Sequence, residues 1–147
     1  MKNLSVRAAA IFIVAASGLA HAQMTPVGTW RSIDDKSGEP RSEIVIAEHN
    51  GALEGRIQKL LGKDVDPAKR CTACKESLQN QPLVGLPIIT GATQAQGKEV
   101  WEGGKILDPE NGKHYTLRLT PIEGGSKLEV RGSIGPFGRT QTWVRVQ

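Results

Sequence analysis

Apolar and polar residues alternate along much of the chain after residue 28, and short turn sequences separate the alternating segments. Alternation with a period of two places apolar side chains on one face of a β-strand and polar side chains on the other. The clearest example joins Arg41–Glu48 to Ala52–Leu61 through Asn50-Gly51. Because Asn-Gly tolerates the positive φ angles of a tight turn, we predict a β-hairpin here.

The same pattern continues through the rest of the chain. We predict strands over residues 29–34, 41–48, 52–61, 86–90, 98–107, 113–120, 126–133 and 139–146. The Gly103-Gly104 pair predicts a bulge or sharp bend within its strand. Strands joined mostly by hairpins favour an up-and-down antiparallel sheet, and closing that sheet removes its exposed edges. We therefore predict an all-β fold, a small antiparallel up-and-down β-barrel of about eight strands, with a β-sandwich as the alternative.

The N-terminus has the three regions of a secretory signal peptide. Met1–Arg7 carries two basic residues and no acid, residues 8–20 form a short apolar run, and Ala20-His21-Ala22 offers small residues for cleavage. We predict a signal peptide over residues 1–22 and a single domain over residues 23–147, placed in the periplasm or secreted. An N-terminal membrane helix is the alternative, but the run is shorter than the ~20 residues that span a bilayer. We expect no transmembrane segment.

Charge gives little indication of a partner. Without Lys2 and Arg7 the chain keeps 17 basic and 15 acidic residues, a net charge of +2. The basic residues are dispersed among the acids, whereas a nucleic-acid interface needs a clustered basic face. We therefore expect no nucleic-acid partner.

A longer pattern spans nearly the whole predicted domain. It consists of Gly28-Thr29-Trp30, Gly55-Arg56-Ile57, Pro82-Leu83-Val84-Gly85, Trp101-Glu102-Gly103-Gly104, Asp108-Pro109, Asn111-Gly112-Lys113, Tyr115, Val130-Arg131-Gly132 and Trp143. This pattern resembles the bacterial exported family catalogued as domain of unknown function 2147. The resemblance implies a lipocalin-like barrel and carries no established catalytic residues.

The first element of this pattern is also similar to the Gly-x-Trp signature of lipocalins. That likeness implies that an arginine on a late strand covers Trp30, and Arg145 and Arg131 are the two candidates. The interior of an eight-stranded barrel is either filled by side chains or holds one small ligand.

The sharpest local feature is Cys71-Thr72-Ala73-Cys74, in the stretch 62–85 that shows no clear periodicity. The preferred interpretation is a structural disulfide that clips this loop in an oxidising compartment. A redox-active dithiol is a second interpretation, but thioredoxin-like sites need a helix N-terminus to lower the thiol pKa. Metal binding is a third, with His49 and His114 as the nitrogen donors. Lys75 stands where covalent haem attachment needs a histidine.

These features predict a non-enzymatic barrel in the cell envelope that binds a small apolar or amphipathic ligand. The predicted ligand-binding residues are Trp30, Ile57, Trp101, Tyr115, Leu117 and Val130. One alternative is an envelope protein-interaction or stress module whose contact surface is the loop 62–85. A further alternative is a thiol-disulfide exchange enzyme using Cys71 and Cys74. We expect neither a cofactor nor a metal.

Overall fold

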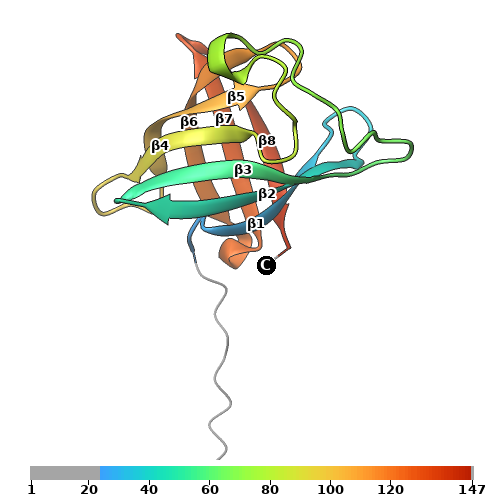
Figure 1. Ribbon diagram of the computed structural model, residues 1–147. Helices are drawn as coiled ribbons and strands as arrows, with labels where there is room; N and C mark the ends of the chain where they lie inside the picture. The colour runs from blue at the N-terminus through green and yellow to red at the C-terminus, as the bar shows by residue number, and fades with distance from the viewer. Residues whose placement is uncertain (1–23, 147) are drawn as a thin grey trace, which may run out of the picture.

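The computed structural model describes residues 24–146, which form a closed β-barrel (Figure 1). The predicted signal peptide lies outside the described residues. The strands are β1 (Gly28–Ile33), β2 (Pro40–His49), β3 (Ala52–Leu60), β4 (Pro87–Gln94), β5 (Trp101–Asp108), β6 (Lys113–Ile122), β7 (Lys127–Ile134) and β8 (Phe137–Arg145). Each strand pairs antiparallel with the next, and β1 also pairs with β8. The predicted all-β, up-and-down barrel is therefore confirmed.

The hairpin turns follow the glycine pattern of the sequence. Asn50 and Gly51 have φ angles of 53° and 81°, as a tight two-residue hairpin requires. At the Gly103-Gly104 pair the β5–β6 register shifts, which confirms the predicted bulge. A Cβ on Gly104 would lie 2.5 Å from the carbonyl oxygen of Thr90, so glycine lets β4 and β5 approach closely here.

Most strand boundaries differ from the prediction by one to four residues, and three of the differences have a clear local cause. β8 begins at Phe137 because Gly135-Pro136 alone makes the turn. β4 continues to Gln94 through residues that show no apolar alternation, because Thr93 and Gln94 pair with β5. β5 starts only at Trp101, after a turn that closes with a backbone hydrogen bond between Ala95 and Val100.

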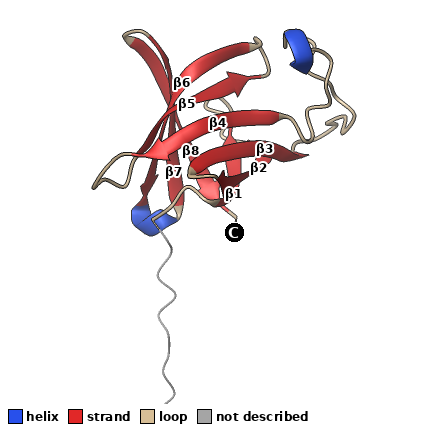
Figure 2. Cartoon of the chain, turned by 60° about the vertical axis from the view of Figure 1, so that its left-hand side comes forward, coloured by secondary structure: helices blue, strands red, loops and turns tan. Residues whose placement is uncertain are grey.

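Successive connections in an up-and-down barrel alternate between its two ends. The β1–β2, β3–β4, β5–β6 and β7–β8 connections therefore share one end, which we call the open end. The remaining connections lie at the closed end. The two short 3₁₀ helices, Glu76–Leu78 and Glu123–Gly125, accordingly lie at opposite ends of the barrel (Figure 2). No helix within residues 24–146 is long and apolar enough to cross a membrane.

Side chains fill the barrel toward its closed end. Trp30 is fully buried, its indole Nε1 donates a hydrogen bond to the carbonyl of Pro26, and the Arg145 guanidinium lies 4.1 Å from the ring centre. Arg145 is thus the arginine that covers the tryptophan. Arg131 is exposed and donates to the hydroxyl of Thr140. The other large side chains that are almost fully buried include Ile46, Leu53, Ile89, Leu119 and Leu128.

Candidate functional site: the open-end cavity

The barrel is hollow toward its open end. A cavity of about 900 Å³ is lined by residues of the barrel strands and of the open-end connections. Proteins bind small molecules in pockets of roughly 300–1,000 Å³. The cavity is therefore closed by side chains at one end of the barrel and open to solvent at the other. Its volume is large enough for one small ligand.

One wall of the cavity is apolar. It is contributed by one inward-facing position on each of five consecutive strands: Ile57 of β3, Ile88 of β4, Ile106 of β5, Tyr115 of β6 and Val130 of β7. The Tyr115 hydroxyl takes part in a 2.8 Å hydrogen bond from the amide of Asn111, so the polar end of this side chain is satisfied at the mouth. The apolar surface of a ligand that lies against this wall would be removed from water, which favours binding.

The opposite wall, where β8, β1 and β2 close the barrel, carries a polar strip beside the apolar lining residues Ile44 and Trp143. Ser32 and Ser42 are paired across β1 and β2, and their hydroxyl oxygens lie 2.8 Å apart. Gln141 of β8 also lines the cavity, and its Oε1 accepts a hydrogen bond from the indole of Trp143. A few polar groups in an otherwise apolar pocket fix the orientation of a ligand. The cavity is therefore amphipathic in cross-section.

The structure divides the predicted ligand-binding residues into two groups. Ile57, Tyr115 and Val130 line the cavity. Trp30, Trp101 and Leu117 are buried in the core and are not among the lining residues. Alternation along a strand identifies which side chains point inward, but not how deep in the barrel each one lies. Sequence reasoning missed Ser32, Ser42 and Gln141, although Ser32 follows Trp30 with the period of two that marks an inward position.

An ion pair spans the mouth of the cavity. Arg41, near the start of β2, donates a hydrogen bond to the carboxylate of Glu110 in the β5–β6 turn and lies 3.5 Å from the carboxylate of Asp34. Strands β3 and β4 separate these two elements around the barrel, so the Arg41–Glu110 pair bridges the opening. The hydrogen bond from Arg41 lowers the pKa of Glu110 and raises the pKa of Arg41. Backbone amides of Ser37 and Lys36 lower the pKa of Asp34.

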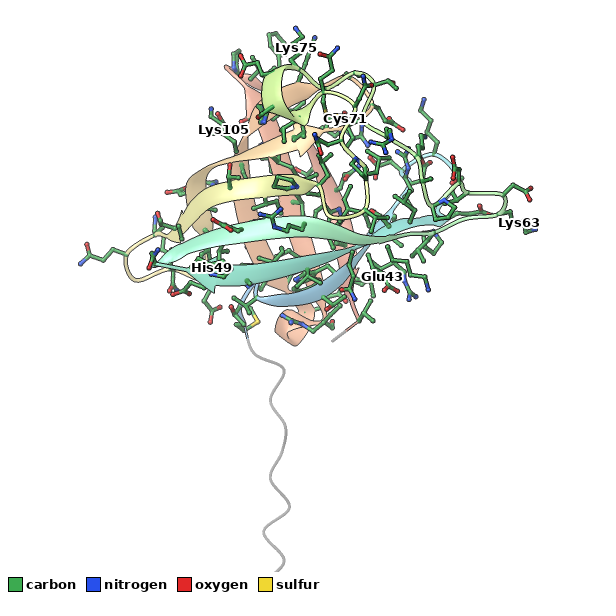
Figure 3. All side chains as sticks on the ribbon, viewed as in Figure 1. Glu43, His49, Lys63, Cys71, Lys75 and Lys105 are labelled. Atoms are coloured by element: carbon green, nitrogen blue, oxygen red, sulfur yellow. A yellow bond between two sulfur atoms is a disulfide. The ribbon has the colours of Figure 1, made fainter. Side chains whose placement is uncertain are left out.

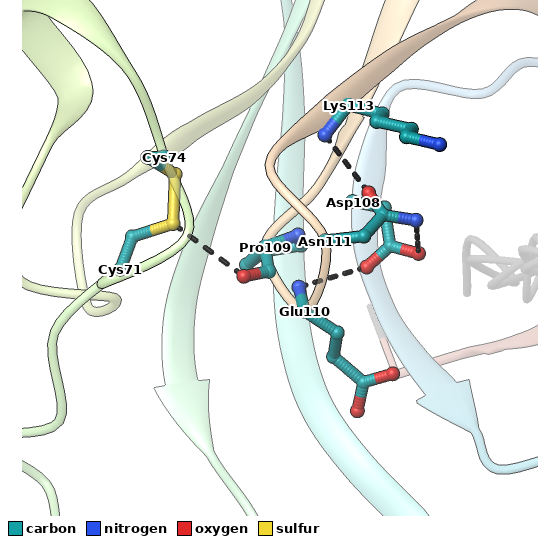
Figure 4. Close-up of a disulfide and its surroundings, with 7 residues drawn as sticks. All are labelled: Cys71, Cys74, Asp108, Pro109, Glu110, Asn111 and Lys113. Carbon is teal, nitrogen blue, oxygen red and sulfur yellow. Dashed lines mark hydrogen bonds between the residues drawn. A yellow bond between two sulfur atoms is a disulfide. The ribbon is translucent and has the colours of Figure 1, made fainter.

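The β3–β4 loop packs against the β5–β6 turn at the same mouth. Cys71 and Cys74 form a disulfide whose Cα atoms are 5.3 Å apart. The Cys71 sulfur lies 3.5 Å from the carbonyl oxygen of Pro109 (Figure 4). A Cβ on Gly112 would lie 1.9 Å from the carbonyl oxygen of Ala73, so only glycine fits at this contact. The disulfide-clipped part of the loop therefore packs against the turn, and Lys69, Arg70 and Thr72 of the loop line the cavity.

The surroundings of the cysteines favour a structural role. Cys71 and Cys74 are 1% and 3% exposed, whereas thiol–disulfide exchange needs a sulfur that an attacking thiolate can reach. His49 lies at the tip of the β2–β3 hairpin, far from Cys71 (Figure 3). Within residues 24–146 no three His, Cys, Asp or Glu side chains are grouped so as to hold a metal ion.

The barrel and its open cavity define a lipocalin-like fold. The fold is similar to that of a solved structure, protein HP1028 from Helicobacter pylori, which is described as belonging to the lipocalin family; the TM-score is 0.69 and the sequence identity 23%, over 82% of each chain. At this identity the likeness concerns the fold.

The family of this chain is identified from its sequence rather than from its fold. Residues 28–145 match the family described as "Uncharacterized protein conserved in bacteria (DUF2147)", and the chain belongs to that family. No protein of curated function matches the chain in sequence.

Proposed function

We propose that this protein is a non-enzymatic binding protein that holds one small apolar or amphipathic ligand in the open-end cavity. The observation that carries the proposal is the cavity of about 900 Å³ with an apolar wall and a polar strip. Burial of apolar ligand surface against the five strands β3–β7 provides the affinity. The hydroxyls of Ser32 and Ser42 and the amide of Gln141 orient a polar group of the ligand.

The uncharged apolar fluorophore N-phenyl-1-naphthylamine tests this proposal, because its emission rises when it leaves water. We expect the wild-type protein to bind the probe. Val130 is 3% exposed and lines the cavity, so Val130→Trp places a large ring inside it. We expect this variant to bind the probe at least roughly tenfold more weakly while keeping its β-sheet circular dichroism.

Val144→Trp is the matched control. Val144 lies on β8 and is 40% exposed, and it is not a lining residue. The same chemical change on the outside of the barrel is expected to leave probe binding at the wild-type level. Failure of the wild-type protein to bind the probe, or equal loss in both variants, contradicts binding in the cavity.

We also propose that the protein is exported to the cell envelope. The N-terminal basic, apolar and small-residue regions support export, and a disulfide is typical of an oxidising compartment. Fractionation of cells that express the full chain, followed by N-terminal sequencing, tests this. We expect a periplasmic or secreted product that begins at Gln23. A cytoplasmic product that retains Met1 contradicts export.

A further inference from the structure

The β7–β8 hairpin ends in the sequence Ile134-Gly135-Pro136-Phe137, which we call the apolar tip. Phe137 is 80% exposed and Ile134 is 54% exposed, the highest values among the large hydrophobic residues of the described chain. Other hairpin turns of the barrel carry polar residues or glycine: Asn50-Gly51, Gln96-Gly97, Glu110-Asn111 and Gly124-Gly125. The apolar tip therefore differs from these other hairpin turns in carrying large apolar side chains.

The backbone presents the apolar tip in a fixed geometry. Gly135 has a φ angle of 55° and Pro136 follows it, the pattern of a two-residue turn with glycine first. Ile134 and Phe137 are directly paired across β7 and β8. Directly paired residues point to the same side of a sheet, so the two side chains project together. The proline ring restricts the turn between them.

The apolar tip is continuous with the cavity. Ile134 and Phe137 both line it, and they lie on the same faces of β7 and β8 as the lining residues Val130 and Gln141. Along β7, the lining residues Val130, Gly132 and Ile134 therefore carry an apolar surface from the interior of the barrel to its rim. Exposed apolar side chains that are grouped beside a cavity are candidates for contact with a partner.

We propose that the apolar tip inserts into the surface of a lipid bilayer and that the cavity exchanges an amphipathic ligand with that bilayer through the open end. The exchange rests on the proposed ligand-binding function, whereas the docking does not. The tip brings Phe137 and Ile134 into the acyl boundary while the rim of the cavity faces the headgroups. A ligand then passes between two apolar environments with little exposure to water.

The shape of the apolar tip favours a bilayer over a protein partner. A stable protein interface needs about 800 Å² on each partner, together with a complementary surface, and a four-residue turn is far smaller than that. A bilayer accepts single projecting side chains without a matching shape. Two cationic side chains at the mouth agree with an anionic lipid surface, because Lys69 and Arg70 line the cavity and form no salt bridge within residues 24–146.

Co-sedimentation with vesicles of phosphatidylethanolamine and phosphatidylglycerol tests the docking. We expect the wild-type protein to sediment with the vesicles and Phe137→Ser to partition roughly tenfold more weakly, as loss of one buried phenyl ring implies. Val144→Ser is the control, since it removes an exposed apolar side chain from the outer wall of β8. Absence of wild-type binding, or equal loss in both variants, overturns the proposal.

A second variant reports insertion directly. The native Trp30, Trp101 and Trp143 are 0%, 7% and 2% exposed, so Phe137→Trp adds a tryptophan in a much more exposed position. We expect vesicles to shift its emission to shorter wavelength and lipids with brominated chains to quench it, with little change in the wild-type spectrum. An unshifted and unquenched signal contradicts insertion, even if the protein sediments.

Two further measurements separate this proposal from its alternatives. Wild-type binding of N-phenyl-1-naphthylamine without vesicles tests the cavity alone, so a protein that binds the probe but not vesicles keeps the proposed function and overturns docking. A protein that binds vesicles but not the probe overturns the exchange.

Sedimentation velocity without lipid tests self-association. A dimer that Phe137→Ser abolishes assigns the apolar tip to contact with a second copy of the chain and overturns the bilayer proposal.

Discussion

At the scale of single residues, Arg145 connects three segments that meet at the closed end of the barrel. Its guanidinium covers the Trp30 ring and donates to the carbonyl oxygens of Thr25 and Val27 at 2.6 and 2.9 Å, and its Nε donates to that of Gly125. Burial lowers the pKa of Arg145, because the charged form loses water. One side chain thus joins the segment before β1, the β6–β7 turn and the end of β8.

We predict that Arg145→Met destabilises the fold, because methionine keeps an apolar stem over Trp30 but satisfies none of the three carbonyl oxygens. Loss of charged hydrogen bonds and of the cation–π contact is expected to lower the free energy of unfolding by about 2 kcal/mol. Urea denaturation followed by tryptophan fluorescence measures this change. Arg131→Met, on the exposed face of β7, is the control and is expected to change stability by less than ~0.5 kcal/mol. Equal effects at both positions would show that the closed end does not depend on Arg145.

At the scale of elements, the contact between the β3–β4 loop and the β5–β6 turn shapes the mouth of the cavity. Two glycines allow a matched test, since Gly112 and Gly97 have φ angles of 70° and 69° in hairpin turns. A Cβ on Gly112 meets the carbonyl of Ala73, whereas a Cβ on Gly97 meets nothing within 4 Å. The two positions therefore share backbone strain and differ in the loop contact.

We predict that Gly97→Ala costs about 1 kcal/mol, from left-handed backbone strain alone. Gly112→Ala is expected to cost a further ~2 kcal/mol, because the loop that holds the disulfide must move away from the turn. Denaturation gives the difference in stability. Hydrogen exchange then locates it, with protection lost in peptides that cover residues 69–86 only in Gly112→Ala. Identical behaviour of the two variants would contradict a tight packing of the loop on the turn.

The same elements show what the sequence can and cannot predict. Strands and hairpins were predictable because alternation and Asn-Gly or Gly-Gly turns act within a few residues. Arg145 over Trp30 was one of two options, and the structure selects it. The contact of Ala73 with Gly112 joins positions 39 residues apart, and the interior of the barrel is filled at one end only. Such packing depends on the closed sheet as a whole, so local sequence patterns did not separate Trp30, Trp101 and Leu117 from the cavity residues.

At the scale of the whole molecule, the open end is held by ion pairs between segments that lie far apart in the sequence. The Arg41–Glu110 pair joins β2 to the β5–β6 turn, and Arg139 of β8 lies 2.7 Å from the carboxylate of Asp35 in the β1–β2 connection. All four side chains are substantially exposed, so each pair contributes at most ~1 kcal/mol to stability. Their main effect is therefore on the width of the mouth rather than on the fold.

We predict that release of a ligand from the proposed binding cavity depends on pH. The pKa values of Glu110 and Asp34 lie below their ordinary values of 4.5 and 3.8. The two carboxylates therefore stabilise the fold fully above these ordinary values, and the stabilisation is lost as the pH falls through the lowered pKa values. Protonated Glu110 no longer holds Arg41, and the bridge across the mouth opens. We predict that dissociation of N-phenyl-1-naphthylamine, measured by stopped-flow fluorescence, becomes faster as the pH falls below the ordinary range of a glutamate carboxyl and through the lowered pKa of Glu110.

Glu110→Gln is expected to release the probe at the faster rate already at neutral pH, because the amide removes the charge that binds Arg41. Its dissociation rate should then change less on acidification than the wild-type rate. Glu129→Gln is the control, since Glu129 is exposed on β7 and is not a lining residue. A wild-type rate independent of pH, or an equal response in both variants, would show that the ligand leaves by a route that the Arg41–Glu110 pair does not cross.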